Sequence, residues 1–334
     1  MNLNFIFRRN QNNRFSIETV FESLFPEINK NATISKTFLE FAGAYPMQLW
    51  RNLKTKISFN DIYHVTGDVH YMAMLRGNKS VLTIHDVGSA YQGGVLRRLY
   101  VGLFWFWLPA MSVKQITVIS EFTKKELLKL VPFIKSKLTV VPNPVNLMYQ
   151  YHNKTFNAKC PEILIIGTKN NKNIERILKA LKGLPCKLHI VGILNEEQML
   201  LLNNLKIAFS NSSSLSTLEM MKAYQDCDLL CFPSTYEGFG MPIIEAQATG
   251  RVVVTSNLGA MKEVAHGSAC LVDPLDSISI RKGLKKVIEN EMYRNKLINK
   301  GFQNVKRFHP IIIAEAYMKV YNTLSCYVFL LFLV

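Results

Sequence analysis

The sequence predicts an α/β protein built from two Rossmann-like domains that face a cleft, and three observations carry this prediction. Short apolar runs alternate with segments of helical periodicity, which is typical of parallel sheets covered by helices on both faces. A polar stretch with prolines and asparagines, residues 142–160, separates two such blocks and is interpreted as a linker. The length of 334 residues corresponds to about two domains.

The first block alternates predicted strands and helices. Short apolar runs predict strands at residues 3–7, 61–65, 81–85, 114–119 and 138–141. Helical patterns predict helices at 16–24 and 121–131, and Ser120 is a typical N-cap for the second of them. Pro142-Asn143-Pro144 then ends the last strand of this block.

The second block begins after Pro161 and repeats the alternation. Its predicted strands are 162–166, 187–191, 228–232, 251–255 and 269–272, and its predicted helices are 173–181, 196–203, 216–224, 242–249 and 277–289. Helical patterns continue from 291 to 323 with an interruption near His309-Pro310. We therefore expect domains at 1–150 and 151–308, followed by a C-terminal helix and apolar tail, 309–334, that can cross back to the first domain.

Basic residues exceed acidic ones by 16, and this charge narrows the classes of partner. Nucleic acid, an anionic membrane and an anionic substrate all attract such a protein. The sequence holds no nucleic-acid-binding motif and its basic residues are spread along the chain, so we expect no nucleic-acid partner. An anionic membrane surface is the preferred additional partner.

Cysteines and apolar segments bear on the location of the protein. The six cysteines form no C-x-x-C pair, which indicates reduced thiols in a cytoplasmic protein. Two apolar stretches, 100–111 and 326–334, are shorter than the roughly 20 residues that a spanning helix needs. The first fits a core helix or an interfacial one, and the second fits a strand, a buried tail or a membrane-dipping end. We expect a cytoplasmic protein with peripheral attachment to the cytoplasmic membrane face.

The segment PSTYEGFGMPIIEAQATG, residues 233–250, joins a predicted strand to a predicted helix through a glycine-containing turn. Free backbone N–H groups and the positive end of a helix dipole favour a phosphate at such a junction. Glu237 and Glu245 frame it, and carboxylates repel phosphate but suit hydroxyl groups. The combination indicates a ligand that is part phosphate and part polyol, such as a sugar nucleotide. Taken alone, the segment equally fits an ordinary loop with solvated acids.

A second loop, Gly167-Thr-Lys-Asn-Asn-Lys-Asn173, follows the first strand of the second block and opens a helix. Lys172 lies where its ammonium can reach a phosphate at the helix start. The loop matches neither G-x-x-x-x-G-K-S/T nor G-x-G-x-x-G, which excludes a P-loop and argues against a dinucleotide site. Standing alone, it also fits a solvated lysine in a turn.

Taken together, these loops give the second block a specific resemblance to a known family. The segment 233–250, the helix and turn from Leu215 to Asp228, and the later Thr255-Ser256-Asn257, Lys262-Glu263-Val264 and Leu271-to-Pro274 runs resemble the nucleotide-sugar-binding domain of family 4 glycosyltransferases. Those enzymes have the GT-B fold and retain anomeric configuration. The resemblance covers about residues 160–305, and it is weaker at His85-Asp86 and Ile119-to-Lys124 in the first block.

The resemblance implies a role for each matching position. Glu237 and the Gly238-Phe239-Gly240 backbone would hold the donor sugar, Glu245 would bind the ribose hydroxyls, and Lys172 would stabilise the departing diphosphate. His85 would approach the sugar from the first domain. The remaining donor contacts would come from residues after two strands of the second block, namely Gly167, Thr168, Lys169, Gly192 and Ile193. The first domain would bind a glycan or lipid-linked acceptor.

Three departures from the family pattern affect these roles. Thr168 stands where arginine is frequent, with Lys169 as a substitute, and this departure affects the expected phosphate contacts. The segment from Arg8 to Arg14 replaces a glycine-rich acceptor loop, and this departure affects the expected acceptor site. Val252 stands where proline is common, and this departure affects only a turn.

The predicted function is retaining transfer of a hexose-type sugar from a nucleotide-diphosphate sugar, without metal or cofactor. Fixed N–H dipoles and Lys172 can stabilise the leaving diphosphate, and no Asp-x-Asp pair is present to hold a metal. Glu237 is interpreted as a sugar-positioning group. The alternative is a non-catalytic sugar-nucleotide-binding homologue or assembly subunit, which Thr168 leaves open. A sugar-nucleotide epimerase would need paired acids that the sequence does not show.

Overall fold

The structure is a computed structural model that describes residues 1–8, 16–41, 45–57 and 60–331, with backbone only at 16 and 326–331. Part of the segment that replaces the glycine-rich loop, Arg9 to Arg14, and the end of the apolar tail, 332–334, lie outside the described residues. The chain divides into two compact units. Unit 1 comprises Met1–Pro144 and Pro310–Val334, and unit 2 comprises Val145–His309.

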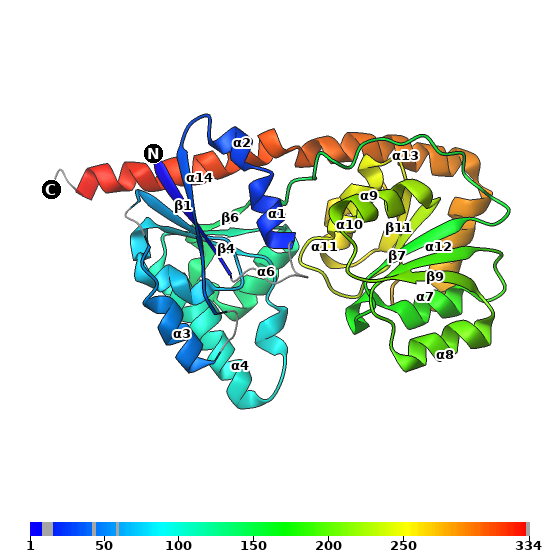
Figure 1. Ribbon diagram of the computed structural model, residues 1–334, viewed down its shortest axis with the longest axis horizontal. Coiled ribbons are helices and arrows are strands. Elements are labelled where there is room, and N and C mark those ends of the chain that lie inside the picture. The colour runs from blue at the N-terminus through cyan, green and yellow to red at the C-terminus, as the bar shows by residue number, and fades with distance from the viewer. Residues whose placement is uncertain (9–15, 42–44, 58–59, 332–334) are drawn as a thin grey trace. The chain divides into compact units, whose positions relative to one another are not determined.

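Unit 1 contains a six-stranded parallel sheet in the order β2-β1-β3-β4-β5-β6 (Figure 1). The strands are β1 (Asn2–Phe7), β2 (Thr33–Phe38), β3 (Ile62–Val65), β4 (Ser80–Ile84), β5 (Gln115–Val118) and β6 (Leu138–Val140). The helices are α1 (Ser16–Glu22), α2 (Phe25–Ile28), α3 (Pro46–Leu53), α4 (Val95–Val101), α5 (Leu108–Ser112), α6 (Glu121–Leu130) and α14 (Pro310–Leu331). A π-helix, η4 (Gly102–Trp107), joins α4 to α5, and 3-10 turns occur at η1 (His70–Leu75), η2 (Gly77–Lys79), η3 (Gly88–Tyr91) and η5 (Pro132–Lys137).

Unit 2 contains a second six-stranded parallel sheet in the order β12-β11-β10-β7-β8-β9. Its strands are β7 (Glu162–Ile166), β8 (Lys187–Val191), β9 (Ala208–Ser212), β10 (Leu229–Phe232), β11 (Val252–Ser256) and β12 (Cys270–Val272). Its helices are α7 (Ile174–Leu181), α8 (Glu196–Leu205), α9 (Thr217–Asp226), α10 (Met241–Ala248), α11 (Gly259–Ala265), α12 (Ser277–Glu289) and α13 (Glu291–Val305), with 3-10 turns at η6 (Asn170–Lys172) and η7 (Lys306–Phe308).

Each sheet reverses its strand order once, and the reversals locate the functional edges. In unit 1 the chain runs from β1 outward to β2 and then returns to β3 on the other side of β1. In unit 2 it runs from β7 through β8 to β9 and then returns to β10 on the other side of β7. In open parallel sheets, ligands bind beyond the carboxyl ends of the strands at such a reversal. The loops after β1 and β3, and those after β7 and β10, are therefore the places to look for a site.

The fold class is confirmed, and the differences from the predicted elements have physical reasons. β2 and β9 were not predicted, because both are edge strands whose side chains are half-buried or exposed and include several polar groups. Ser120 caps α6 as expected, since its hydroxyl accepts a hydrogen bond from the Thr123 amide at 3.0 Å.

The final helix, α14, belongs to unit 1. The Tyr321 hydroxyl lies 2.7 Å from Nδ1 of the buried His64 on β3, and the ring of Tyr321 meets Phe5 of β1 edge-on. The apolar run that starts at Cys326 continues this helix as far as Leu331. Among the described residues, no helix combines the length and the apolar character needed to cross a bilayer.

Candidate active site

The two loops singled out in the second block meet at the reversal of the unit 2 sheet. Gly167–Asn173 follows β7 and Pro233–Gly240 follows the neighbouring β10. Backbone hydrogen bonds join them, since the Thr235 amide donates to the Asn171 carbonyl at 2.8 Å. Asn173 adopts a left-handed conformation, and its side-chain amide donates to the carbonyls of Pro233 and Pro274. This buried asparagine fixes the start of α7 against the β10 loop.

Lys172 and Glu237 form an ion pair at this junction. The Lys172 Nζ lies 2.6 Å from the Glu237 Oε1, and both side chains are mostly buried, with 20% and 17% of their surface exposed. The Asn171 amide donates to the same Glu237 oxygen at 3.2 Å and to the Tyr236 carbonyl. The ammonium also lies 4.7 Å from the centre of the Phe232 ring. A cation and an anion are thus held together at the carboxyl edge of the sheet, with solvent access to both.

Glycines make room for this arrangement. Gly167 has a φ of +86°, and a Cβ there would lie 2.9 Å from Cγ and Cε of Lys172. Gly192, at the end of β8, has a φ of +145°, and a Cβ there would lie 2.8 Å from the Thr168 methyl carbon. Thr168 donates to the Ile193 carbonyl at 2.5 Å, which joins the loops after β7 and β8. The side chains of Lys169 and Ile193 are exposed to solvent and therefore accessible to a ligand.

Glu245 has a different environment from Glu237. It lies on α10, and the Tyr224 hydroxyl of α9 donates to its Oε2 at 2.6 Å. Burial raises the pKa of the Glu245 carboxyl to about 7, although the hydrogen bond from Tyr224 favours the ionised form. The carboxyl therefore changes charge near neutral pH.

The pKa of Glu245 has a measurable consequence for stability. In the folded protein it lies above the ordinary value, so folding favours the protonated form and the stability from this group falls as pH rises from about 4.5 to about 7. Relative to Glu245→Gln, wild type is expected to lose on the order of 2 kcal/mol of unfolding free energy across that window. Chemical denaturation of both unliganded proteins at pH 5 and pH 8 measures the difference. Equal losses in the two proteins would contradict the prediction.

The side chain of Phe239 is buried in the core of unit 2. Its ring packs edge-on against Phe308 at 5.5 Å between centroids. The backbone of Gly238-Phe239-Gly240 remains the part that can contact a sugar, with Gly240 at a φ of +107° immediately before α10.

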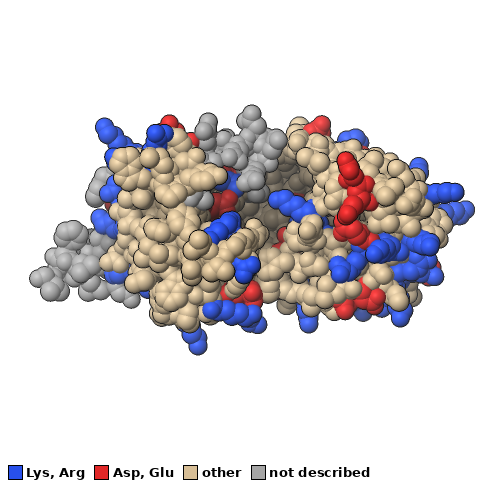
Figure 2. Space-filling model, turned by 90° about the horizontal axis from the view of Figure 1, so that it is seen from below, with Lys and Arg blue, Asp and Glu red and all other residues tan. Residues whose placement is uncertain are grey.

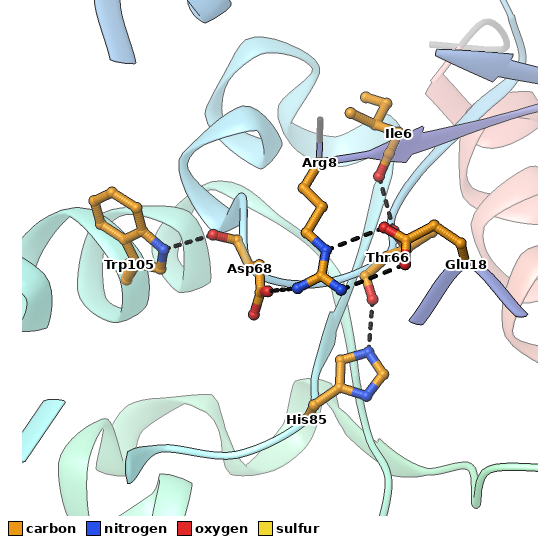
Figure 3. A network of polar contacts seen from close by, with 7 residues as sticks. All are labelled: Ile6, Arg8, Glu18, Thr66, Asp68, His85 and Trp105. Atoms are coloured by element: carbon orange, nitrogen blue, oxygen red, sulfur yellow. Dashed lines mark hydrogen bonds and ion pairs between the residues drawn. The ribbon is translucent and has the colours of Figure 1, made fainter. Parts of the chain in front are cut away.

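In unit 1, a polar network surrounds the corresponding reversal between β1 and β3 (Figure 3). Arg8, which follows β1, donates from Nε and Nη2 to the two oxygens of Glu18 on α1, at 3.1 and 3.4 Å. Its third nitrogen, Nη1, donates to the Asp68 carboxylate beyond β3. Glu18 is buried and Asp68 is half exposed, with 53% of its side-chain surface accessible. The guanidinium therefore fixes an accessible carboxylate at the edge of the sheet.

Asp68 is held by its backbone as well. It has a φ of +58°, which aspartate and asparagine tolerate better than other non-glycine residues. The Trp105 indole on η4 donates to the Asp68 carbonyl at 2.7 Å (Figure 3). Left-handed residues held in this way by surrounding structure often mark functional sites.

His85, after β4, lies beside this network. Its Nε2 is 2.7 Å from the Thr66 carbonyl, which can only accept, so Nε2 carries the hydrogen and Nδ1 carries the lone pair. Burial lowers the pKa of His85, so the imidazole is neutral at neutral pH. A Cβ on Gly67 would lie 2.6 Å from the ring, so only glycine allows this approach. The ring therefore offers a hydrogen-bond acceptor to a hydroxyl group.

The structure brings together part of the predicted set and adds residues that the sequence did not indicate. In unit 2 it joins Lys172 to Glu237, and Thr168 to Ile193, while in unit 1 His85 stands beside Asp68. The additional residues are Asn171, Asn173 and Tyr224 in unit 2, and Arg8, Glu18, Asp68 and Trp105 in unit 1. Asn171 is adjacent to Lys172, but spacing gives no sign that Tyr224 meets Glu245 or that Arg8 meets Glu18. Among the described residues, no group of three or more metal-binding side chains gathers at one point.

Two family descriptions match successive parts of the chain. Residues 16–149 match "Glycosyltransferase Family 4", and residues 151–304 match "Glycosyl transferases group 1". The chain belongs to glycosyltransferase family 4. This glycosyltransferase is 26% identical to the O-antigen chain mannosyltransferase RfbU of Salmonella typhimurium over 290 residues, which are 81% of this chain and 79% of that protein. It is 34% identical to the phosphatidyl-myo-inositol mannosyltransferase of Mycobacterium tuberculosis over 110 residues, 31% of this chain and 29% of that protein.

Solved structures of similar fold are more distant in sequence. Sucrose-phosphate synthase from Thermosynechococcus elongatus superposes with a TM-score of 0.76 at 16% identity, covering 97% of this glycosyltransferase and 99% of that chain. Anabaena HepE in complex with UDP and glucose gives a TM-score of 0.75 at 14% identity, covering 97% and 100%. These likenesses establish the GT-B fold.

Proposed function

We propose that this glycosyltransferase moves a hexose, mannose foremost, from a nucleoside diphosphate to a hydroxyl of a glycan or lipid-linked acceptor, with retention of configuration. The Lys172–Glu237 pair at the reversal of the unit 2 sheet carries the proposal. Mannose is favoured because relatives from three bacterial genera are named mannosyltransferases. We place the protein in the cytoplasm, where peripheral contact with a membrane would give it access to a lipid-linked acceptor.

The pair suits a sugar bound to a diphosphate. Negative charge develops on the diphosphate as the sugar–phosphate bond breaks, and a fixed ammonium stabilises it. Without donor, Lys172 is neutralised by Glu237 at 2.6 Å. A bound diphosphate would draw the ammonium toward itself and leave the Glu237 oxygens to accept hydrogen bonds from sugar hydroxyls. Lys172 and Glu237 are therefore the proposed catalytic contacts, supported by the loop amides of Thr168 and Lys169. The Gly167 amide already donates to the Val191 carbonyl at 2.7 Å, so Gly167 contributes by leaving room for the Lys172 side chain.

The nucleoside would be held by residues around the same edge. Glu245 is placed at the ribose hydroxyls, because its carboxylate accepts hydrogen bonds and is already oriented by Tyr224. Gly192 and Ile193 are placed at the base, since they follow the neighbouring strand β8 and Gly192 has no side chain to block it. The backbone of Gly238, Phe239 and Gly240 is placed at the sugar.

Unit 1 would hold the acceptor. Asp68 is the proposed contact for the attacking acceptor hydroxyl, because its carboxylate is accessible and oriented by Arg8. His85 is the proposed contact for a hydroxyl of the transferred sugar, through its Nδ1 lone pair. Retention would follow if the leaving phosphate takes the proton of the attacking hydroxyl on the donor's own face.

We expect transfer to proceed without added metal, because Lys172 supplies the positive charge at the proposed diphosphate position. Turnover in excess chelator should match that in buffer within about twofold, since the ammonium and backbone N–H groups provide the electrostatic stabilisation. Radiolabelled-sugar transfer with and without chelator makes the measurement. Loss of activity that manganese or magnesium restores would show that the leaving group depends on a metal.

The donor is identified by a direct screen. GDP-mannose, UDP-glucose and other nucleotide sugars are incubated with the full chain, and release of the nucleoside diphosphate is measured alongside thermal stabilisation. GDP-mannose is expected to give the fastest release. Stabilisation by a nucleotide sugar without release or transfer, in the presence of acceptor extracts, would favour the non-catalytic homologue.

A further inference from the structure

We propose that the exposed face of the helical segment from α4 through η4 to α5 is the surface that docks on an anionic lipid membrane. This inference deepens the proposed function and rests on it only for the lipid-linked acceptor. The proposal names one face of unit 1. The apolar composition of residues 100–111 alone does not identify that face.

The segment exposes an apolar stripe while its other side is anchored in the core. Val101, Phe106 and Ala110 are buried in unit 1. The opposite side carries apolar residues spaced three or four positions apart, so they line one face of the helical segment. We call this set the apolar stripe, and its members, with their exposed fractions, are Leu96 (84%), Leu99 (66%), Leu103 (45%), Trp107 (40%) and Met111 (60%).

Aromatic residues extend the stripe in the way that bilayer interfaces favour. Trp107 packs against the exposed Phe133 of η5, with ring centroids 5.2 Å apart. Tryptophan and other amphipathic side chains concentrate at the level of lipid headgroups. The stripe also runs through a π-helix, a rare element that occurs often at functional sites.

The charge around the stripe is positive. Residues 87–120 include Arg97, Arg98 and Lys114 and no Asp or Glu. Arg97 donates to the carbonyls of Ser89 and Gln92, and Arg98 donates to the carbonyl of Gly93. Within the described residues, neither arginine forms an ion pair with a carboxylate. Both are exposed, so their charge remains available to anionic headgroups. The face of unit 1 seen in Figure 2 is largely tan with blue side chains among it and few red ones.

The same charge disfavours a second copy of the chain as the occupant. In a twofold dimer the same patch meets itself, so each copy would bring its own Arg97 and Arg98 into an interface to which residues 87–120 contribute no acidic side chain. Like charges brought together in an interface cost free energy, whereas lipid phosphates neutralise them. An anionic bilayer therefore complements both the apolar stripe and its charge.

The stripe is directly linked to the proposed acceptor contact. Trp107 belongs to the stripe, and Trp105, two residues earlier on η4, donates to the Asp68 carbonyl. The Trp105 carbonyl also lies 2.7 Å from Nδ1 of the buried His70 on η1. One short helical element thus carries both the docking surface and a support for Asp68, so an acceptor embedded in the membrane would arrive close to the contact proposed for it.

Vesicle flotation of the full chain tests the proposal. Wild type should float with phosphatidylglycerol-containing vesicles and much less with pure phosphatidylcholine. The double variant Leu99→Asp, Leu103→Asp should partition onto anionic vesicles about tenfold less or lower, because buried apolar area sets interfacial affinity. The matched control Leu200→Asp, Ile278→Asp replaces two apolar residues of unit 2 that are each 62% exposed, against 66% for Leu99 and 45% for Leu103, and it should float like wild type.

A charge pair of variants and an activity measurement complete the test. Arg97→Gln with Arg98→Gln should remove the preference for anionic lipid, whereas Arg97→Lys with Arg98→Lys should keep it. Release of nucleoside diphosphate from donor in solution should be unchanged in all of them, so failure of docking is distinguished from failure of the enzyme. Wild-type flotation by the stripe variant would overturn the proposal. So would a wild type that stays in solution and forms a stripe-dependent dimer in sedimentation.

Discussion

Lys172→Ala is expected to lower turnover by about 10²-fold while the protein stays folded, because one preorganised charge contact to the leaving group is lost. The Lys172 ammonium is the cation held by Glu237 at the reversal of the unit 2 sheet. Since the contact to the leaving diphosphate strengthens as charge develops, the loss should fall mainly on kcat and less on the KM for donor. Initial-rate kinetics over a range of donor concentrations separate the two parameters.

Two further variants make the result specific to the position of the charge. Lys179→Ala removes an exposed lysine from α7, the helix that follows the Lys172 loop, and should leave turnover unchanged. Gly167→Ala keeps Lys172 but places a methyl 2.9 Å from its stem, so it should displace the ammonium and also slow turnover. Wild-type rates from folded Lys172→Ala protein would exclude this lysine from the reaction.

Substitutions of Glu237 test the other member of the ion pair. Glu237→Gln retains the shape and the contact with Asn171 but removes the charge that neutralises Lys172 without donor. Because glutamine still accepts a hydrogen bond from a sugar hydroxyl, the variant should retain more activity than Glu237→Ala. The ratio of the two rates measures how much of the role of Glu237 is positioning.

The fold could be predicted from the sequence because its buried strands are continuous apolar runs. Strands such as β7 (EILII) and β10 (LLCF) are buried on both faces and stand out without an alignment. The edge strands β2 and β9 escape detection, because solvent-facing positions admit polar residues and erase the apolar run. The sequence also does not reveal strand order, so the residues alone do not predict that the loops after β7 and β10 meet.

The candidate site likewise contains residues that local sequence signals mark and residues that they do not. Lys172 and Glu237 lie in loops whose glycines and helix starts mark them out, and the structure brings these two residues into contact. The partners that orient other groups come from distant positions without local signals, as Tyr224 does for Glu245 and Arg8 for Asp68. The resemblance assigns only the backbone of Phe239 to the donor sugar, and its side chain packs in the core against Phe308.

Asp68→Asn is expected to lower kcat/KM for the acceptor by about 10- to 10²-fold, the range for losing a hydrogen bond to a charged group. Asparagine tolerates the φ of +58° as aspartate does, so the backbone and its hydrogen bond from Trp105 should persist. Hydrolysis of the donor by water should stay close to wild type, because Asp68 is assigned to the acceptor alone. Transfer and hydrolysis measured in the same reaction report both values.

A matched substitution separates this role from a general effect of charge. Asp61→Asn removes an aspartate that accepts a hydrogen bond from the Asn2 amide at the opposite, amino-terminal edge of the same sheet. It should leave both transfer and hydrolysis unchanged. If Asp68 only braced Arg8 and Glu18, Asp68→Asn would loosen the network and depress hydrolysis and transfer together, with a lower unfolding temperature. A selective loss of transfer at unchanged stability is the outcome that places the acceptor hydroxyl at Asp68, since bracing alone cannot distinguish an acceptor from water.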